Sequence, residues 1–544
     1  MAVMEKGFLN IILHAHLPYV HHPEHDSFFE ENWLFEAITE CYVPLIGVLD
    51  RLQRDNVGYR LTLSLSPTLI SMLRDGLLQT RYLKHLHKLL ELAEKEILRT
   101  RNKPEYRKLA RLYRRFFLNT LSVYQDQYAC DLLSAFKKHH STGKLELITC
   151  AATHGFLPLL SVSETAVRNQ INVGIGTFKA TFGVAPVGFW LPECGYYPGL
   201  EEVLSDAGIR YFFVDTHSIT HASEQPLHGV YAPLACNNGV AAFARDPDSS
   251  RQVWSSHEGY PGDFDYREYY SDIGFDLDID YLAPYILEGK TRVNTGIKYH
   301  RVTGKNGAKE IYQPRTARQK AKQHASDFIN KRQQQINSLS VAMGRSPQPP
   351  IVTAPYDAEL FGHWWFEGPY WLEYVLRLAD ENTNGIETVS CVDYLDQGVS
   401  LQVATPSAST WGDQGYSSYW INESNDWIYP HLHKASTQME KFVCELQGLM
   451  VSPLQERALN QAVRSILLAQ ASDWPFIMKS GTTIDYANKR ITDHLARFNY
   501  LHDSVRSGKI DERYLTALEI MDNIFPDLDF RNYCPKVAVK STLL

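Results

Sequence analysis

The chain has 544 residues, of which 44% are hydrophobic and 21% charged, and its formal net charge is −8. Such a length exceeds one ordinary domain, and the composition is that of a globular protein with a large core. The acidic balance excludes a protein built to bind nucleic acid, because phosphate recognition needs clustered Lys and Arg. The eight cysteines have no CxxC spacing, and no run of 18 apolar residues occurs. We therefore expect a cytoplasmic monomer with no membrane contact and no disulfide framework.

Short apolar runs rich in β-branched residues predict buried strands along the first 400 residues. They lie at 8–13, 59–65, 145–151, 187–191, 209–214, 240–244, 351–354 and 386–391. Their continuous apolar character is typical of parallel strands covered on both faces. Helical patterns lie between many of them, for example at 164–181 and 200–207. This order predicts an α/β fold, most simply a barrel of seven or eight strands with its chemistry at the carboxyl ends of the strands.

Helical segments interrupt and follow this strand-and-helix order. Residues 70–140 predict long charged helices inserted after the second strand, and 299–348 predict a polar surface helix. After about residue 400 the strand patterns end. Helical patterns then follow at 431–449, 453–471, 484–505 and 510–522. We therefore predict a catalytic barrel at 1–400, with an insertion at about 70–140, and a C-terminal helical domain at 401–544.

Polar residues stand directly after the predicted strands. They include His14, His16, His154, Glu193, Asp215, Asp357 and Glu359. Two carboxylates from different strands are the minimal apparatus for glycosyl transfer, since one attacks the anomeric carbon and the other protonates the leaving oxygen. Glu193 and Asp357 suit these roles, and a retaining enzyme would hold their carboxyl groups ~5–5.5 Å apart. Glu359 is a rival proton donor, because it shares a face with Asp357 in an extended segment.

His14 and His16 point to one face of the first strand, and three interpretations are open. They bind a metal ion together with Asp215 and His154, they contact sugar hydroxyls, or they are hydrogen-bonded histidines of the core. Contact with sugar hydroxyls is the preferred interpretation.

Three tryptophans, Trp411, Trp420 and Trp427, lie in a Gly- and Ser-rich segment that joins the barrel to the C-terminal helices. Aromatic side chains in a polar loop are poor core material, but their faces stack on sugar rings. Structural packing remains the alternative. Asp473, between two predicted helices, is placed to reach the cleft.

At these residues the chain resembles glycoside hydrolase family 57, and within it the 1,4-α-glucan branching enzymes. The resemblance extends over essentially the whole chain. Its segments are HAHLPY (14–19), THGFLP (153–158), WLPECGY (190–196), PYDAELFGHWWFEG (355–368) and TWGDQGYSSYW (410–420). It implies a distorted (β/α)7 barrel with an inserted helical region and a C-terminal helical domain. It also implies a retaining mechanism without a metal or other cofactor.

The resemblance further implies that Glu193 is the nucleophile and that Asp357, rather than Glu359, is the acid/base. It implies substrate contacts for His14, His16, His154, Arg267, Trp411, Trp420 and Asp473. Phe275 stands where some relatives carry Trp, so the resemblance implies a stacking contact with a sugar ring less firmly at this position. The implied substrate is an α-1,4-glucan such as amylose or glycogen, which receives α-1,6 branches.

Other activities fit parts of the same pattern. A 4-α-glucanotransferase or an α-amylase would use the same carboxylates, a deacetylase or mannosidase would use a metal, and a non-catalytic protein would only bind glucan. A branching enzyme must also keep water from the intermediate. We assign that task to an enclosing loop at 218–239, which contains Tyr231 and Pro233.

Overall fold

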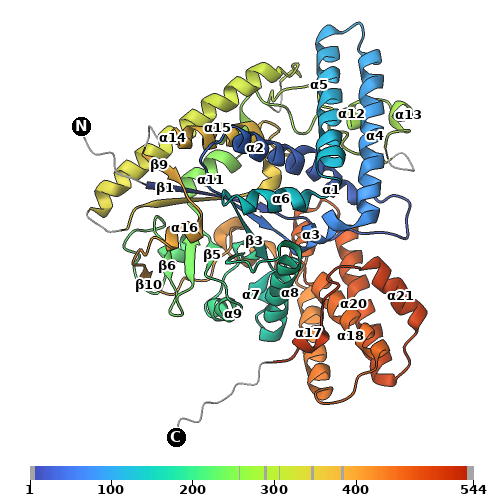
Figure 1. Cartoon of the computed structure of the whole chain (residues 1–544). Coiled ribbons are helices and arrows are strands. Elements are labelled where there is room, and N and C mark those ends of the chain that lie inside the picture. Colours follow the sequence, from blue (N-terminus) through green and yellow to red (C-terminus); the bar gives the residue numbers. More distant parts are fainter. Residues whose placement is uncertain are drawn as a thin grey trace.

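The computed structural model describes residues 7–255, 258–286, 291–304, 307–344, 348–381 and 385–535. A curled sheet lies at its centre with helices around it, and the C-terminal helices pack beside it (Figure 1). The strands are β1 (Gly7–Ala15), β2 (Leu61–Leu65), β3 (Leu145–Cys150), β4 (Gly188–Trp190), β5 (Tyr211–Val214), β6 (Leu234–Ala235), β7 (Ala241–Ala244), β8 (Ile351–Asp357), β9 (Ile386–Thr388) and β10 (Gln402–Val403).

Seven strands form a parallel run in the order β8–β1–β2–β3–β4–β5–β7. Just beyond β7, the backbone N–H of Asp246 donates to Thr353 O of β8 at 2.9 Å, so the two ends of the run approach each other. The fold is therefore the distorted α/β barrel that the sequence predicts. Every predicted apolar run forms a strand, with β9 pairing to β1. The sequence does not predict β6 and β10, because two residues carry no periodic signal.

The helices of the barrel and its insertion follow the chain order. They are α1 (Glu31–Ala37), α2 (Val43–Arg54), α3 (Pro67–Arg74), α4 (Gly76–Arg99), α5 (Pro104–Leu121), α6 (Leu132–Ser141), α7 (Leu157–Leu160), α8 (Glu164–Phe182), α9 (Leu200–Asp206), α10 (Thr216–Thr220), α11 (Pro247–Trp254), α12 (Ile273–Asp276), α13 (Ile279–Leu282), α14 (Pro314–Met343), α15 (Gly368–Asp380) and α16 (Cys391–Leu395). The long helices α4 and α5 stand side by side, linked by the Arg114–Glu94 ion pair of 3.0 Å (Figure 1).

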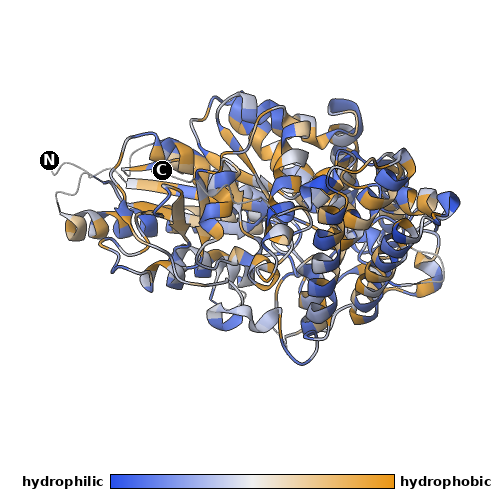
Figure 2. Cartoon of the chain, turned by 90° about the horizontal axis from the view of Figure 1, so that it is seen from below, coloured by the Kyte–Doolittle hydropathy of each residue, from blue (hydrophilic) through white to orange (hydrophobic). Residues whose placement is uncertain are grey.

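Hydrophobic residues concentrate on the strands, whereas most helices carry both hydrophilic and hydrophobic residues (Figure 2). All residues of β1, β2 and β3 are buried, as expected for parallel strands covered on both sides. The polar helix α14 also buries one row of small and apolar side chains, so it is more than the predicted surface excursion. Among the described residues, no helix has both the length and the apolar character that crossing a bilayer requires.

Helix α8 shows how local sequence positions the end of β3. Ser163 caps its first turn by accepting from Ala166 N at 3.2 Å, and Gly183 ends it with a left-handed φ of 80°. A Cβ on Gly174 would lie 2.2 Å from the carbonyl oxygen of Cys150. Glycine therefore lets α8 pack directly on β3, just before the loop that carries His154.

The C-terminal helices are α17 (Ile428–Glu445), α18 (Pro453–Ala469), α19 (Asp473–Ser480), α20 (Ile484–Ser507) and α21 (Glu512–Met521). Four of them match the predicted patterns, and the short α19 is not predicted. The turn before α19 meets the loop after β3, where Ser472 N donates to His154 O at 3.0 Å. This contact brings the start of α19 to the rim of the barrel.

Candidate active site

A cavity of about 920 Å³ opens at the carboxyl ends of the parallel strands. Residues at or just beyond the ends of six strands line it, namely His14, His16, His154, Glu193, Asp215, Arg245 and Asp357. The C-terminal part of the chain adds Trp411, Tyr419, Trp420, Asp473 and Phe476. The structure therefore brings together all the predicted site residues except Arg267, Phe275 and Trp427.

Glu193 lies in a single 3-10 turn after β4, with φ 61° and ψ 22°. This left-handed conformation is uncommon for a residue with a Cβ, and such strain is often found at functional sites. Trp411 Nε1 donates to Glu193 Oε2 at 2.9 Å, and Ser472 Oγ donates to Oε1 at 3.0 Å. Burial raises the pKa of Glu193, and these two hydrogen bonds oppose that rise. The donors fix both carboxylate oxygens, as an ionised nucleophile requires.

Asp357 is the last residue of β8 and is paired in register with His14 of β1. Burial, and then the negative charge of Glu193, raise its pKa to about 7. Within the described part of the chain, no hydrogen bond holds its carboxyl group. Asp357 therefore carries a proton for much of the time at neutral pH and is free to give it to a substrate oxygen.

Glu359 also lines the cavity, and burial raises its pKa to about 7. Its Oε1 accepts from the Tyr42 hydroxyl at 2.5 Å and from the His16 backbone N–H at 3.3 Å. These two donors tie Glu359 to the wall. The geometry therefore favours Asp357 over Glu359 as the group that exchanges protons with a substrate.

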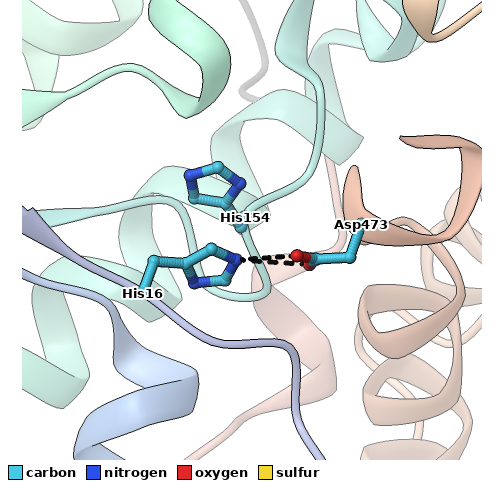
Figure 3. A group of neighbouring side chains, drawn as sticks. All are labelled: His16, His154 and Asp473. Atoms are coloured by element: carbon cyan, nitrogen blue, oxygen red, sulfur yellow. Dashed lines mark hydrogen bonds and ion pairs between the residues drawn. The ribbon is translucent and has the colours of Figure 1, made fainter. Parts of the chain in front are cut away.

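The three predicted histidines form a connected group that ends at Asp473. His14 Nε2 lies 3.0 Å from His154 Nε2. Figure 3 shows the second contact, in which His16 Nε2 lies 3.1 Å from Asp473 Oδ1. Burial lowers the pKa of His14 and His154 well below the ordinary value. Burial also acts to lower the pKa of His16, but the charge and hydrogen bond of Asp473 raise it overall. The site therefore holds two neutral imidazoles beside one that is readily charged.

His16, His154 and Asp473 hold ligand atoms within 4.8 Å of one another, as a metal site would (Figure 3). The two imidazole rings, however, are stacked, with 3.8 Å between centroids and 12° between planes. A metal ion binds in the plane of an imidazole at about 2.0–2.1 Å, and one ion cannot lie in two parallel planes so far apart. Asp215, the other expected ligand, is ion-paired with Arg245. These residues fit contacts to a polar substrate better than a shared metal ion.

The aromatic residues of the cavity differ in what they expose. Trp420 is 1% exposed and stacks on Phe156, with 4.6 Å between ring centroids. It therefore packs in the core, the alternative to stacking on a sugar ring. Gly412 is needed at this position, because a Cβ there would lie 2.7 Å from the Trp420 ring. Phe476 is 43% exposed and stacks against Tyr419 at 5.2 Å. This pair presents an open aromatic surface to the cavity.

Arg267 and Phe275 do not line the cavity. The Arg267 side chain is 1% exposed, lies 3.1 Å from Glu40 and sits 3.9 Å above the Phe366 ring. Phe275 is half exposed on α12. Arg267 therefore neutralises a buried carboxylate in this structure, a role that its position in the sequence does not reveal.

The segment 218–239 does not border the cavity either, so the expectation of an enclosing loop there is not met. Tyr231 O accepts from Ile351 N at 3.0 Å, and its hydroxyl accepts from Gln335 at 3.2 Å. Ser223 N donates to Thr405 O at 2.9 Å. These contacts hold the segment against α14 and the residues around β10. Instead, α11 and the 411–420 segment border the cavity.

Sequence reasoning missed several residues of the cavity region, among them Arg245, Trp254, Ser472 and Phe476. Arg245 follows the predicted strand at 240–244, so the rule of polar residues after strands would have found it. Ser472 and Phe476 flank Asp473 in the turn and first residues of α19, and no pattern in the sequence marks either of them.

Comparisons with known proteins agree with this geometry. The model of glycosyl hydrolase family 57 matches residues 10–405, and that of the C-terminal region of 1,4-alpha-glucan branching enzymes matches residues 431–533. The 1,4-alpha-glucan branching enzyme TK1436 of Thermococcus kodakarensis is 32% identical, over 96% of this chain and 77% of its own length.

Solved structures superpose closely on the whole chain. The alpha-amylase AmyC of Thermotoga maritima does so with a TM-score of 0.91 at 44% identity, covering 98% of this chain and 100% of that one. The branching enzyme of Pyrococcus horikoshii gives a TM-score of 0.86 at 33% identity, with 97% of each chain covered. Since the family model spans most of the sequence, the chain belongs to glycoside hydrolase family 57.

Proposed function

We propose that this protein is a retaining 1,4-α-glucan branching enzyme, which cleaves an α-1,4 linkage and transfers the freed chain to a 6-hydroxyl of another glucan. The observation that carries the proposal is the pair of unlike carboxyl groups in one cavity. Glu193 is held by two donors, whereas the pKa of Asp357 is raised to about 7. Residues 431–533 and the relatives from Thermococcus and Pyrococcus support the branching reaction.

In the first step, a Glu193 oxygen attacks C1 of a glucosyl unit while Asp357 donates its proton to the leaving glycosidic oxygen. The C1–O bond breaks, and a glycosyl ester forms on Glu193. The hydrogen bonds from Trp411 and Ser472 hold the carboxylate for this attack. The charged form of His16, next to Asp473, provides positive charge near the carboxylates.

In the second step, the Asp357 carboxylate removes the proton from a 6-hydroxyl of an acceptor glucan. The oxygen attacks C1, the ester bond to Glu193 breaks, and an α-1,6 linkage forms. Two displacements at C1 retain the α configuration. Water competes with the acceptor, so the yield of branches depends on how well the enzyme holds a second chain. We place this reaction in the synthesis of glycogen-type glucan in the cytoplasm, in keeping with eight free cysteines.

A second candidate function is hydrolysis of the same substrate. AmyC, which shares 44% of its residues with this chain, is described as an alpha-amylase. The same cavity would perform that reaction if water took the place of the 6-hydroxyl. The two functions therefore differ only in the acceptor.

Incubation with amylose separates these functions. The wild-type enzyme should create α-1,6 linkages, seen as anomeric signals by NMR and as short chains released by isoamylase. Glu193→Gln should form none. Glu359→Gln tests the rival proton donor and should keep far more activity than Asp357→Asn. A wild-type product of shortened linear chains alone would refute branching and leave hydrolysis.

A further inference from the structure

Trp254 is the most exposed tryptophan of the cavity, and neither the fold nor the proposed mechanism uses it. It ends α11, lines the cavity, and is 68% exposed. A tryptophan has the largest apolar surface of any side chain, so such exposure inside a cavity points to a ligand rather than to packing.

The helix that carries Trp254 is fixed to the strand that carries Asp357. Asp246 caps α11 by accepting from Ser249 N at 2.7 Å, and it pairs with buried Arg332 at 3.2 Å. The hydroxyl of Tyr356, one residue before Asp357, donates to Ser249 O at 3.1 Å. These contacts fix the helix that carries the indole before any ligand arrives, which lowers the entropic cost of stacking a sugar on it.

The place of α11 decides which part of the glucan reaches Trp254. Asp357 protonates the leaving oxygen and later takes the proton of the acceptor hydroxyl, so the leaving and acceptor chains lie on its side. Phe476 and Tyr419 also line the cavity, but they come from α19 and the segment before α17. Because the contact between Tyr356 and Ser249 ties α11 to the strand that ends at Asp357, Trp254 is assigned to the acceptor side of the site.

We propose that Trp254 is the stacking platform that holds the acceptor glucan, and that it sets the ratio of chain transfer to hydrolysis. This inference rests on the proposed function. An indole face covers the apolar C–H face of one glucose unit, and the 6-hydroxyl of a neighbouring unit is then held near C1 of the glycosyl ester. Fixing the acceptor in this way raises its effective concentration against water.

The test compares Trp254→Ala and Trp254→Phe with Trp427→Ala, a partly exposed tryptophan that does not line the cavity. In the Glu193→Gln background, calorimetry with maltoheptaose should show about tenfold weaker binding for Trp254→Ala, as expected from uncovering about 55 Å² of apolar surface. For Trp254→Phe, the loss of binding free energy should be about half of the loss for Trp254→Ala. Trp427→Ala should bind like its parent.

In the active enzyme, the number of α-1,6 bonds formed per bond hydrolysed should fall about tenfold in Trp254→Ala. The rate of hydrolysis of α-maltotriosyl fluoride should fall at least five times less than the rate of chain transfer. The reason is that the leaving fluoride is too small to contact residue 254. An unchanged ratio of transfer to hydrolysis, or an equal loss of both, would overturn the inference. If the wild type forms no α-1,6 bonds while Trp254→Ala still weakens maltoheptaose binding, the branching function fails and the platform stands as a glucan-binding residue.

Discussion

Replacing Trp411 by Phe isolates a hydrogen bond that holds Glu193, the proposed nucleophile. Phe keeps an aromatic ring against Trp190, whose ring centroid lies 5.1 Å away, but it removes the Nε1 donor at 2.9 Å from Glu193. A hydrogen bond to a charged group contributes about 1.5–3 kcal/mol. At about 1.36 kcal/mol per unit, its loss raises the pKa of Glu193 by about 1–2 units. Glu193 must be ionised to attack, so the acidic limb of kcat/KM should move to higher pH by that amount.

The assay is the pH profile of kcat/KM on an aryl α-maltooligoside. Trp420→Phe is a matched control, since the Nε1 of Trp420 is buried and has no partner among the described residues. Its acidic limb should stay at the wild-type position. If Trp411→Phe lowers the rate at every pH without moving the limb, the hydrogen bond does not set the ionisation of Glu193 and the reasoning fails.

Three further predictions concern other parts of the structure. The pKa of Asp357 is raised to about 7, and its protonated form is the proposed proton donor. The value of kcat/KM on glucans should therefore fall about tenfold per pH unit above that pKa. Asp357→Asn should lower kcat/KM more than a thousandfold and remove this pH dependence. Glu40→Ala leaves Arg267 buried without its partner and should lower the free energy of unfolding in urea by about 3–5 kcal/mol, whereas adding Arg267→Met should recover most of it. Burial acts to raise the pKa of Glu40, but the charge of Arg267 and the hydrogen bond from His363 lower it to about 2. The contribution of ionised Glu40 to the free energy of unfolding should therefore be complete above about pH 4.5 and lost as the pH falls towards 2. Dialysis against EDTA should leave activity unchanged, because the stacked rings of His16 and His154 do not share a metal ion; recovery of activity on adding stoichiometric zinc would contradict this.

The strands and long helices of the fold follow from the sequence, because local patterns specify them. Continuous apolar runs marked the strands from β1 to β9 except β6, and amphipathic patterns marked α8, α17, α18, α20 and α21. The pattern fails for a few short elements, namely β6, β10 and α19, which tertiary contacts stabilise. It also misplaces α14 as a surface excursion, because small residues such as Ala317 and Ala321 give a weak apolar signal although they are buried.

Much of the site also follows from one rule, that polar residues directly after parallel strands meet at one rim. This rule alone brings Glu193, Asp357 and the histidines together. It does not locate Ser472, which reaches Glu193 from 279 residues away in the sequence. It also cannot tell that Arg267 forms an ion pair with Glu40, since the two residues are 227 positions apart in the sequence.

The sequence by itself determined the order of the main strands and long helices and the candidates for the reacting groups, because periodicity and side-chain chemistry are local properties. Tertiary structure alone decided which aromatic faces stay open. Trp420 closes onto Phe156, whereas Trp254 faces the cavity, although both are tryptophans in polar segments. It also decided the ionisation of each carboxyl group, because burial, neighbouring charges and hydrogen-bond donors come from residues far apart in the chain.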